Sequence, residues 1–195
     1  WLNRFAELNS NGGQFRSIKM EYDAKLRPGG ASTVGTVTTD SLSMRFGSRV
    51  VFDLSASAND QVNIGVLTLE SKDWEYGPQY LSPVFEFVLP ARTEITEGKY
   101  LLGEVGEIAG AIGDIRIEGL GTKKKSSLVH EDGKLYLVVS DTRQADSIIW
   151  NGNVDNVWDF FNTQNFTLAS NPEVTDETFV TGDKVLFTSG ANNYT

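Results

Sequence analysis

The sequence of 195 residues contains no cysteine. The chain therefore has no disulfide, no thiol chemistry and no metal site with thiolate ligands. It has one histidine, so a zinc site built from the usual ligand types is excluded as well. No apolar run approaches the roughly 20 residues of a membrane-spanning helix, and no signal peptide is visible.

Basic residues are also scarce, with 17 Lys and Arg against 26 Asp and Glu and a net charge of −9. Proteins that follow a nucleic-acid backbone depend on clustered Lys and Arg, so this balance argues against nucleic acid as a partner. The one basic run, residues 123–125, has Gly and Ser on its flanks and is interpreted as a solvated loop.

Catalytic motifs are missing too. His130 would be needed for a Ser-His-Asp site and Asp132 is close, but no G-x-S-x-G motif occurs, so His130 is interpreted as an exposed histidine beside a turn. Carboxylates are frequent enough for a paired-carboxylate glycosidase, yet no pair stands out. We therefore expect no catalysis from this segment itself.

What the sequence does contain is alternation of apolar and polar residues, which predicts strands. Turn sequences rich in Gly, Asn, Asp and Ser separate the runs, as in residues 131–134. A helix is predicted only near the start, where Leu2, Phe5 and Leu8 have helical spacing; a strand followed by an Asn-Gly turn also fits there. The predicted strands lie within residues 17–26, 41–54, 61–70, 85–89, 98–105, 114–120, 133–140 and 183–190.

The strands recur at intervals of twenty-odd residues. Ile18, Leu42 and Val62 follow one another with this spacing, and each lies in a predicted strand. Such a period is typical of a solenoid, in which short strands from successive coils stack side by side. The sequence thus predicts an all-β fold, a right-handed single-stranded parallel β-helix. A β-sandwich of seven to nine strands is the alternative.

Residues 35–71 resemble the last passenger coils of bacterial autotransporter-type β-helices. The elements of that pattern occur in order as Gly47, Phe52-Asp53-Leu54, Asp60-Gln61-Val62 and Gly65. Residues 85–120 are similar to the family's next segment, in which a strand precedes a Gly-rich loop; Gly98, Tyr100 and Leu101-Leu102 match that strand, and a Gly-rich segment follows at 103–122. Residues 130–141 resemble its closing strand, with a turn at Asp132-Gly133.

Residues 147–187 resemble an autotransporter-associated β-strand repeat. The matching string is Trp150-Asn151-Gly152, Trp158-Asp159, Asn165-Phe166 and Gly182-Asp183-Lys184-Val185-Leu186-Phe187, with Phe166 where the repeat usually has Trp. The two resemblances cover most of residues 31–195. They imply β-helix coils over 1–140, with a long loop at 71–83, and the truncated start of a further repeat over 141–195.

The resemblance implies a non-catalytic part of an exported bacterial protein, extracellular or on the outer surface, that acts as a stalk, scaffold or adhesive passenger. The alternative is the C-terminal part of a carbohydrate-active β-helix enzyme, a polysaccharide lyase or glycoside hydrolase, with a loop that contacts glycan. The start at Trp1 without Met and the strand-like end lead us to expect cuts through a repeating structure, covered by the rest of the polypeptide or another copy.

The candidate carbohydrate-binding residues are Trp74, Tyr76 and Tyr80 in the loop 71–83. Aromatic rings beside carboxylates and amides can stack on a sugar and hydrogen-bond it, and loops thrown out from a solenoid often form its binding face. The other interpretation is that these rings cover the core. No cofactor is expected, although turn carboxylates such as Asp141, Asp146 and Asp183 are possible calcium ligands.

Overall fold

The computed structural model describes residues 1–30, 33–55, 58–70, 82–90, 95–120, 124–140, 143–160 and 162–191. The chain divides into two compact units. Unit 1 comprises Trp1–Leu120 and Ser126–Val139, and unit 2 comprises Gly121–Lys125 and Ser140–Thr195.

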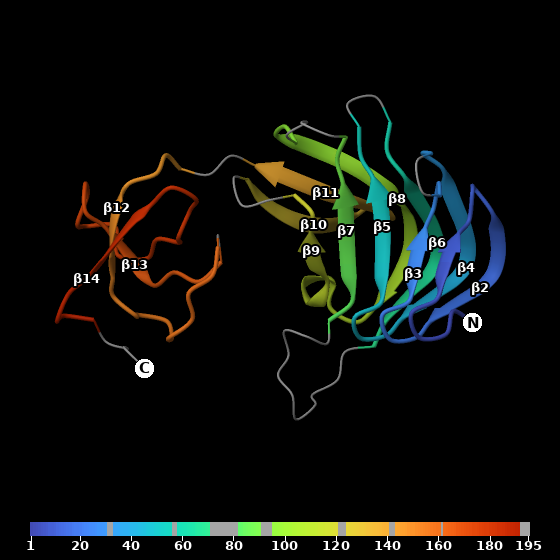
Figure 1. Cartoon of the computed structure of the whole chain (residues 1–195), viewed down its shortest axis with the longest axis horizontal. Coiled ribbons are helices and arrows are strands. Elements are labelled where there is room, and N and C mark those ends of the chain that lie inside the picture. The colour runs from blue at the N-terminus through green and yellow to red at the C-terminus, as the bar shows by residue number, and fades with distance from the viewer. Residues whose placement is uncertain are drawn as a thin grey trace. The chain divides into compact units, whose positions relative to one another are not determined.

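In unit 1 the chain passes back and forth between two sheets, so that odd-numbered strands from β1 to β9 form one and even-numbered strands from β2 to β8 belong to the other (Figure 1). Neighbouring strands among these nine pair in parallel. The strands are β1 (Glu7–Asn9), β2 (Gln14–Met20), β3 (Lys25–Arg27), β4 (Thr36–Met44), β5 (Arg49–Asp53), β6 (Gln61–Leu69), β7 (Val84–Val88), β8 (Gly98–Ala109) and β9 (Arg116–Glu118).

The register confirms one of the two predicted repeat steps. Ile18 of β2 pairs with Leu42 of β4, as the predicted spacing requires. Leu42 then pairs with Leu67, whereas Val62 pairs with Val37, so the predicted step from Leu42 to Val62 is wrong. The true step runs from Leu42 to Leu67 and keeps both on the same buried face; a slip by one residue would turn one of them outward.

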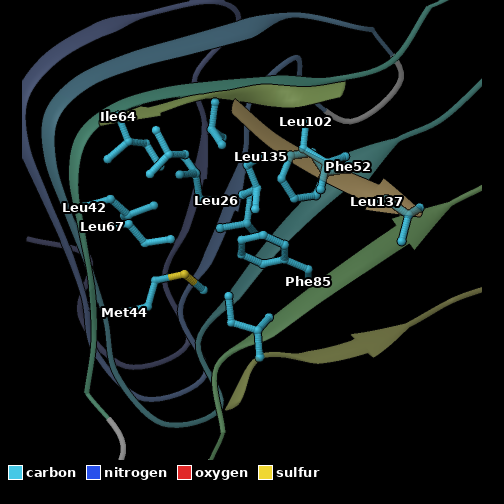
Figure 2. Close-up of a cluster of buried hydrophobic side chains, with 14 of the residues drawn as sticks. Leu26, Leu42, Met44, Phe52, Ile64, Leu67, Phe85, Leu102, Leu135 and Leu137 are labelled. Atoms are coloured by element: carbon cyan, nitrogen blue, oxygen red, sulfur yellow. The ribbon is translucent and has the colours of Figure 1, made fainter. Parts of the chain in front are cut away.

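The two sheets share one apolar core. Leu42, Met44 and Leu67 from the six-stranded sheet point toward Leu26 and Phe85 from the five-stranded sheet (Figure 2). All five side chains are buried. In β4 and β6 the buried residues alternate with more exposed ones over most of the strand. The alternation seen in the sequence is therefore the division between core and solvent.

An antiparallel hairpin ends the six-stranded sheet. Its strands are β10 (Lys125–Glu131) and β11 (Lys134–Ser140), and β11 pairs antiparallel with β8. Asp132 and Gly133 have φ of 50° and 70°, as expected for the two central residues of a type I′ turn. The predicted turn is confirmed. The prediction of a loop at residues 123–125 is wrong at Lys125, which is the first residue of β10.

The start of the chain is a strand and not a helix. β1 is followed by Asn11 and Gly12, both with positive φ, so the alternative of a strand and an Asn-Gly turn is confirmed and the predicted helix is wrong. Pairing with β3 gives this segment the hydrogen bonds that a short isolated helix could not secure. In the described part of the chain, no helix is long and apolar enough to cross a membrane.

Unit 2 has a three-stranded sheet of its own. β12 (Ser147–Trp150) lies between β13 (Phe166–Leu168), which is antiparallel to it, and β14 (Lys184–Phe187), which is parallel to it. Its fully buried apolar cluster is small and consists of Ile148, Trp150 and Phe166. The chain as described is thus all-β with parallel sheets. Both the predicted β-helix and the alternative β-sandwich place such sheets around a common core.

Candidate functional site

The predicted carbohydrate-binding residues Trp74, Tyr76 and Tyr80 lie outside the described residues, as does the loop around them up to residue 81. The structure therefore gives no geometry for this candidate site. The described residues contain several other arrangements of polar or aromatic side chains.

The first arrangement is the set of amides in residues 147–168, which hold the backbone of unit 2. Asn165 is completely buried, and its Oδ1 accepts hydrogen bonds from the N–H groups of Val154 and Asp155 at 2.8 and 3.2 Å. Its Nδ2 donates to Asp155 Oδ1 and to the Val157 carbonyl. With its donors and acceptor all used, Asn165 has no polar atom left for a ligand.

The second arrangement is a buried ion pair. The side chain of Asp183 is 0% exposed, and both of its oxygens accept hydrogen bonds from Arg143 at 2.7 Å. They also accept the N–H groups of Asp146 and Val180 at 2.9 and 2.8 Å. Burial acts to raise the pKa of Asp183, but the guanidinium and the two N–H groups outweigh it and hold the pKa below its ordinary value.

This ion pair bears on the possible calcium ligands. Asp183 is occupied by Arg143, and the hydrogen bonds that Asp146 accepts from Ser170 and Ser147 lower the pKa of Asp146. Asp141 lies outside the described residues. Within the described ranges, no three His, Cys, Asp or Glu side chains come together as metal ligands would.

The third arrangement is an aromatic surface on unit 2, formed by Trp158, Phe160 and Phe187. Trp158 is 49% exposed and Phe187 60% exposed, and their ring centroids are 6.1 Å apart. Phe179 lies beneath them, 5.2 Å from Trp158 and 4.9 Å from Phe160. Trp150, in contrast, is buried. Trp150 therefore belongs to the core of unit 2, and Trp158 belongs to its surface.

Unit 1 contains two neighbouring carboxyl groups, Asp60 and Asp53, of which Asp60 is bonded to the backbone. Asp60 is completely buried and accepts the N–H groups of Gly35 and Asp53 at 2.8 and 2.9 Å. Burial raises the pKa of both Asp60 and Asp53. Asp60 thus ties the end of β5 at Asp53 to the backbone at Gly35, and the neighbouring Asp53 carboxyl also acts to raise the pKa of Asp60.

His130 differs from its sequence interpretation. It lies within β10, is half-buried, and its Nε2 is 2.7 Å from the carbonyl oxygen of Val105. The strand continues closer to the Asp132-Gly133 turn than the sequence pattern indicated, so the histidine is not an exposed turn residue. It contacts backbone and no nucleophilic side chain in the described part of the molecule.

No protein-family model matches this chain, and no curated protein matches it either. Sequence reasoning overlooked Arg143, although one signal was present: between residues 143 and 191, Arg143 and Lys184 are the only basic residues. A lone Arg in an acidic segment is a reasonable candidate for a buried ion pair.

Proposed function

We propose that this chain is a non-catalytic, right-handed parallel β-helical segment of an exported bacterial protein, located outside the cell or on its outer surface as a stalk, scaffold or adhesive passenger. The observation that carries the proposal is the parallel register of unit 1. The chain alternates between two sheets, and the paired positions advance by nearly the same number of residues from Ile18 to Leu42 and from Leu42 to Leu67. This pattern is expected when successive coils stack on one another. Connections between parallel strands of one sheet are nearly always right-handed.

Ladders of outward side chains support the same interpretation. Arg45 hydrogen-bonds Glu21 on one neighbouring coil and Glu70 on the other, both at 2.7 Å. The hydroxyl of Ser41 donates to that of Ser17 at 3.0 Å, across strands that pair in register. A repeated unit that presents equivalent positions one above another produces such ladders, and each cross-strand pair adds a small stabilisation.

The polar clusters of the described residues favour a structural role over catalysis. Asn165, Asp60 and Asp183 each direct their oxygens at backbone N–H groups or at Arg143. Groups saturated in this way fix the positions of loops and strands, and are unsuited to exchange protons with a substrate.

The location is tested with an epitope-tagged copy of the protein in the cells that make it. We expect protease added to intact cells, or to the culture medium, to remove the tag while a cytosolic marker survives. Protection of the tag until the cells are lysed would overturn the proposed location. A control with detergent-permeabilised cells shows that the tagged chain can be cleaved.

A further inference from the structure

The last residue of β5, Asp53, carries a buried oxygen without a partner. In the described part of the chain, Oδ2 of Asp53 is buried and has no hydrogen-bond partner. Burial deprives such an acceptor of water, and the cost is largest when the carboxyl group is ionised. A proton on the carboxyl group removes the charge and with it most of that cost.

The buried carboxyl group of Asp60 is held beside Asp53. The N–H of Asp53 donates to Oδ2 of Asp60 at 2.9 Å, and the N–H of Asp60 donates to the carbonyl of Asp53 at 3.0 Å. The other oxygen of Asp60 accepts the N–H of Gly35 at 2.8 Å. These bonds keep the two acidic side chains close together and out of water, where the charge of one disfavours the charge of the other.

One cation faces this pair of carboxyl groups. Arg27 of β3 attracts both Asp53 and Asp60, but its Nε also donates to Glu7 of β1 at 3.0 Å. On β7, the residue paired with Asp53 is the uncharged Val88. Three carboxyl groups thus share one guanidinium, and a bound proton would reduce the excess of negative charge.

The pair lies where the chain passes from β5 to β6. Leu54 and Asn59 form an antiparallel bridge there, and Nδ2 of Asn59 donates to the carbonyl of Leu101 in β8. Asp60 adds its bond to Gly35, which directly precedes β4. The turn is therefore bonded to parts of the chain that are distant in sequence, and the charge on the pair bears on how firmly it is held.

We propose that Asp53 and Asp60 together bind a proton in the folded state, and that this proton stabilises the turn between β5 and β6. The pair makes unit 1 sensitive to pH: its fold gains stability as the medium becomes more acidic and loses it as the pH rises. The proton belongs to the pair, since two strongly interacting groups titrate together. This inference concerns unit 1 alone and is independent of the proposed location of the protein.

The sign of the effect follows from the pKa values of the two groups. Burial raises the pKa of both, the Asp53 carboxyl raises that of Asp60 further, and Arg27 acts in the opposite direction. An aspartate whose folded pKa exceeds the unfolded value of about 3.9 contributes stability that is fully present below the unfolded pKa. That stability is lost as the pH rises through the folded pKa, which is the reverse of the behaviour of Asp183 in unit 2.

The first test follows the side-chain carboxyl carbons of aspartate in the whole chain by NMR, between about pH 3 and about pH 8. We expect the carboxyl carbon of Asp53 or of Asp60 to titrate at least about one pH unit above the unfolded value of about 3.9. Titration of both residues at or below that value would overturn the proposal.

The second test compares the parent with Asp53→Asn, and Asp40→Asn is the matched control because Asp40 is exposed in β4 of the same unit. Asp53→Asn should lower the pKa of Asp60, since the neighbouring carboxyl group is gone. Between about pH 4 and about pH 7, the folding equilibrium constant of the parent should fall at least about tenfold more than that of Asp53→Asn. Asp40→Asn should behave as the parent does, and equal pH dependence in the parent and Asp53→Asn would overturn the proposal.

Urea unfolding provides these equilibrium constants. The fluorescence of Trp150 and Trp158 identifies the transition of unit 2, and the remaining change in far-UV circular dichroism reports on unit 1. If Asp53→Asn is not folded, Asp53→Ser replaces it, because Ser also carries no charge. Calcium at about 1 mM and about pH 7 should leave the urea midpoint unchanged. Stabilisation by calcium that the Asp53 variant abolishes would overturn the proposal, because the pair would then bind a cation in place of a proton.

Discussion

Replacing Asp183 with Asn should unfold unit 2 at conditions where the parent is stable. The four hydrogen bonds to Asp183 divide equally between its oxygens: Oδ1 accepts Arg143 and the Asp146 N–H, while Oδ2 accepts Arg143 and the Val180 N–H. Asn can present oxygen on one side only. Its NH₂ group then faces one guanidinium N–H and one backbone N–H, and Arg143 loses its bidentate carboxylate partner and keeps Glu177 at 3.4 Å.

The expected magnitude follows from the burial of this carboxylate, whose side chain is 0% exposed. Each orphaned buried donor costs about 1–3 kcal/mol, and breaking one half of a buried ion pair costs about 3–5 kcal/mol. We therefore expect a loss of about 3–5 kcal/mol. Domains are stable by only about 5–15 kcal/mol, and the buried apolar cluster of unit 2 has three members, so this loss should be decisive there.

The assay is urea unfolding followed by tryptophan fluorescence. The chain has four tryptophans, and Trp1→Phe with Trp74→Phe leaves Trp150 and Trp158 as reporters of unit 2. Far-UV circular dichroism follows the β-structure of the whole chain. Asp176→Asn is the matched control, because Asp176 is exposed in the same segment. If Asp183→Asn shifts unfolding no more than Asp176→Asn does, the buried pair does not stabilise unit 2 and the reasoning fails.

Acidification should unfold unit 2 before unit 1. Because the pKa of Asp183 is lowered in the fold, its ionised form stabilises unit 2 above the unfolded pKa of about 3.9, and this stabilisation is lost as the pH falls through the folded pKa. The pKa of Asp60 in unit 1 is raised, so protonation of Asp60 favours the fold. Loss of the far-UV dichroism of the whole chain before the fluorescence change of Trp150 and Trp158 would contradict this order. Gly103→Ala should destabilise unit 1 by about 1–3 kcal/mol or more, because φ is +141° and a Cβ would lie 1.9 Å from the Val62 carbonyl oxygen; an unchanged urea midpoint would show that the strands can separate there. Trp74→Ala should abolish retention on polysaccharide affinity gels if the loop 71–83 stacks on sugar, and equal retention of parent and variant would end that prediction.

Local sequence signals were sufficient for most strands and for the tightest turn. Strands such as β6 are visible because buried apolar residues alternate with polar ones at Val62 and Ile64 and again at Leu67 and Leu69. The Asp132-Gly133 turn is visible because few residues other than Gly, Asn and Asp adopt positive φ readily. Both features are determined by residues that are close together in the sequence, so they can be predicted from one sequence.

Features that join distant residues were not predictable in this way. Arg143 and Asp183 lie far apart in the sequence, and neither residue type indicates its partner. The apolar residues at the start of the chain have helical spacing, but the segment forms the strand β1 because it pairs with β3. The step from Leu42 was misjudged since Val62 and Leu67 are both buried in β6, and only the register distinguishes them.

The hairpin β10–β11 also has a consequence for the order in which unit 1 folds. Its two strands are joined by a tight turn at Asp132-Gly133, so it can form in about 1–10 μs without waiting for distant chain. Every parallel pair in the unit must instead close a much longer loop, which is slower. We expect the hairpin to form first and to provide the template on which β8 and then the earlier strands assemble. Pulsed hydrogen exchange during refolding would show it as early amide protection in β10 and β11, and protection that begins in β2 and β4 would contradict this order.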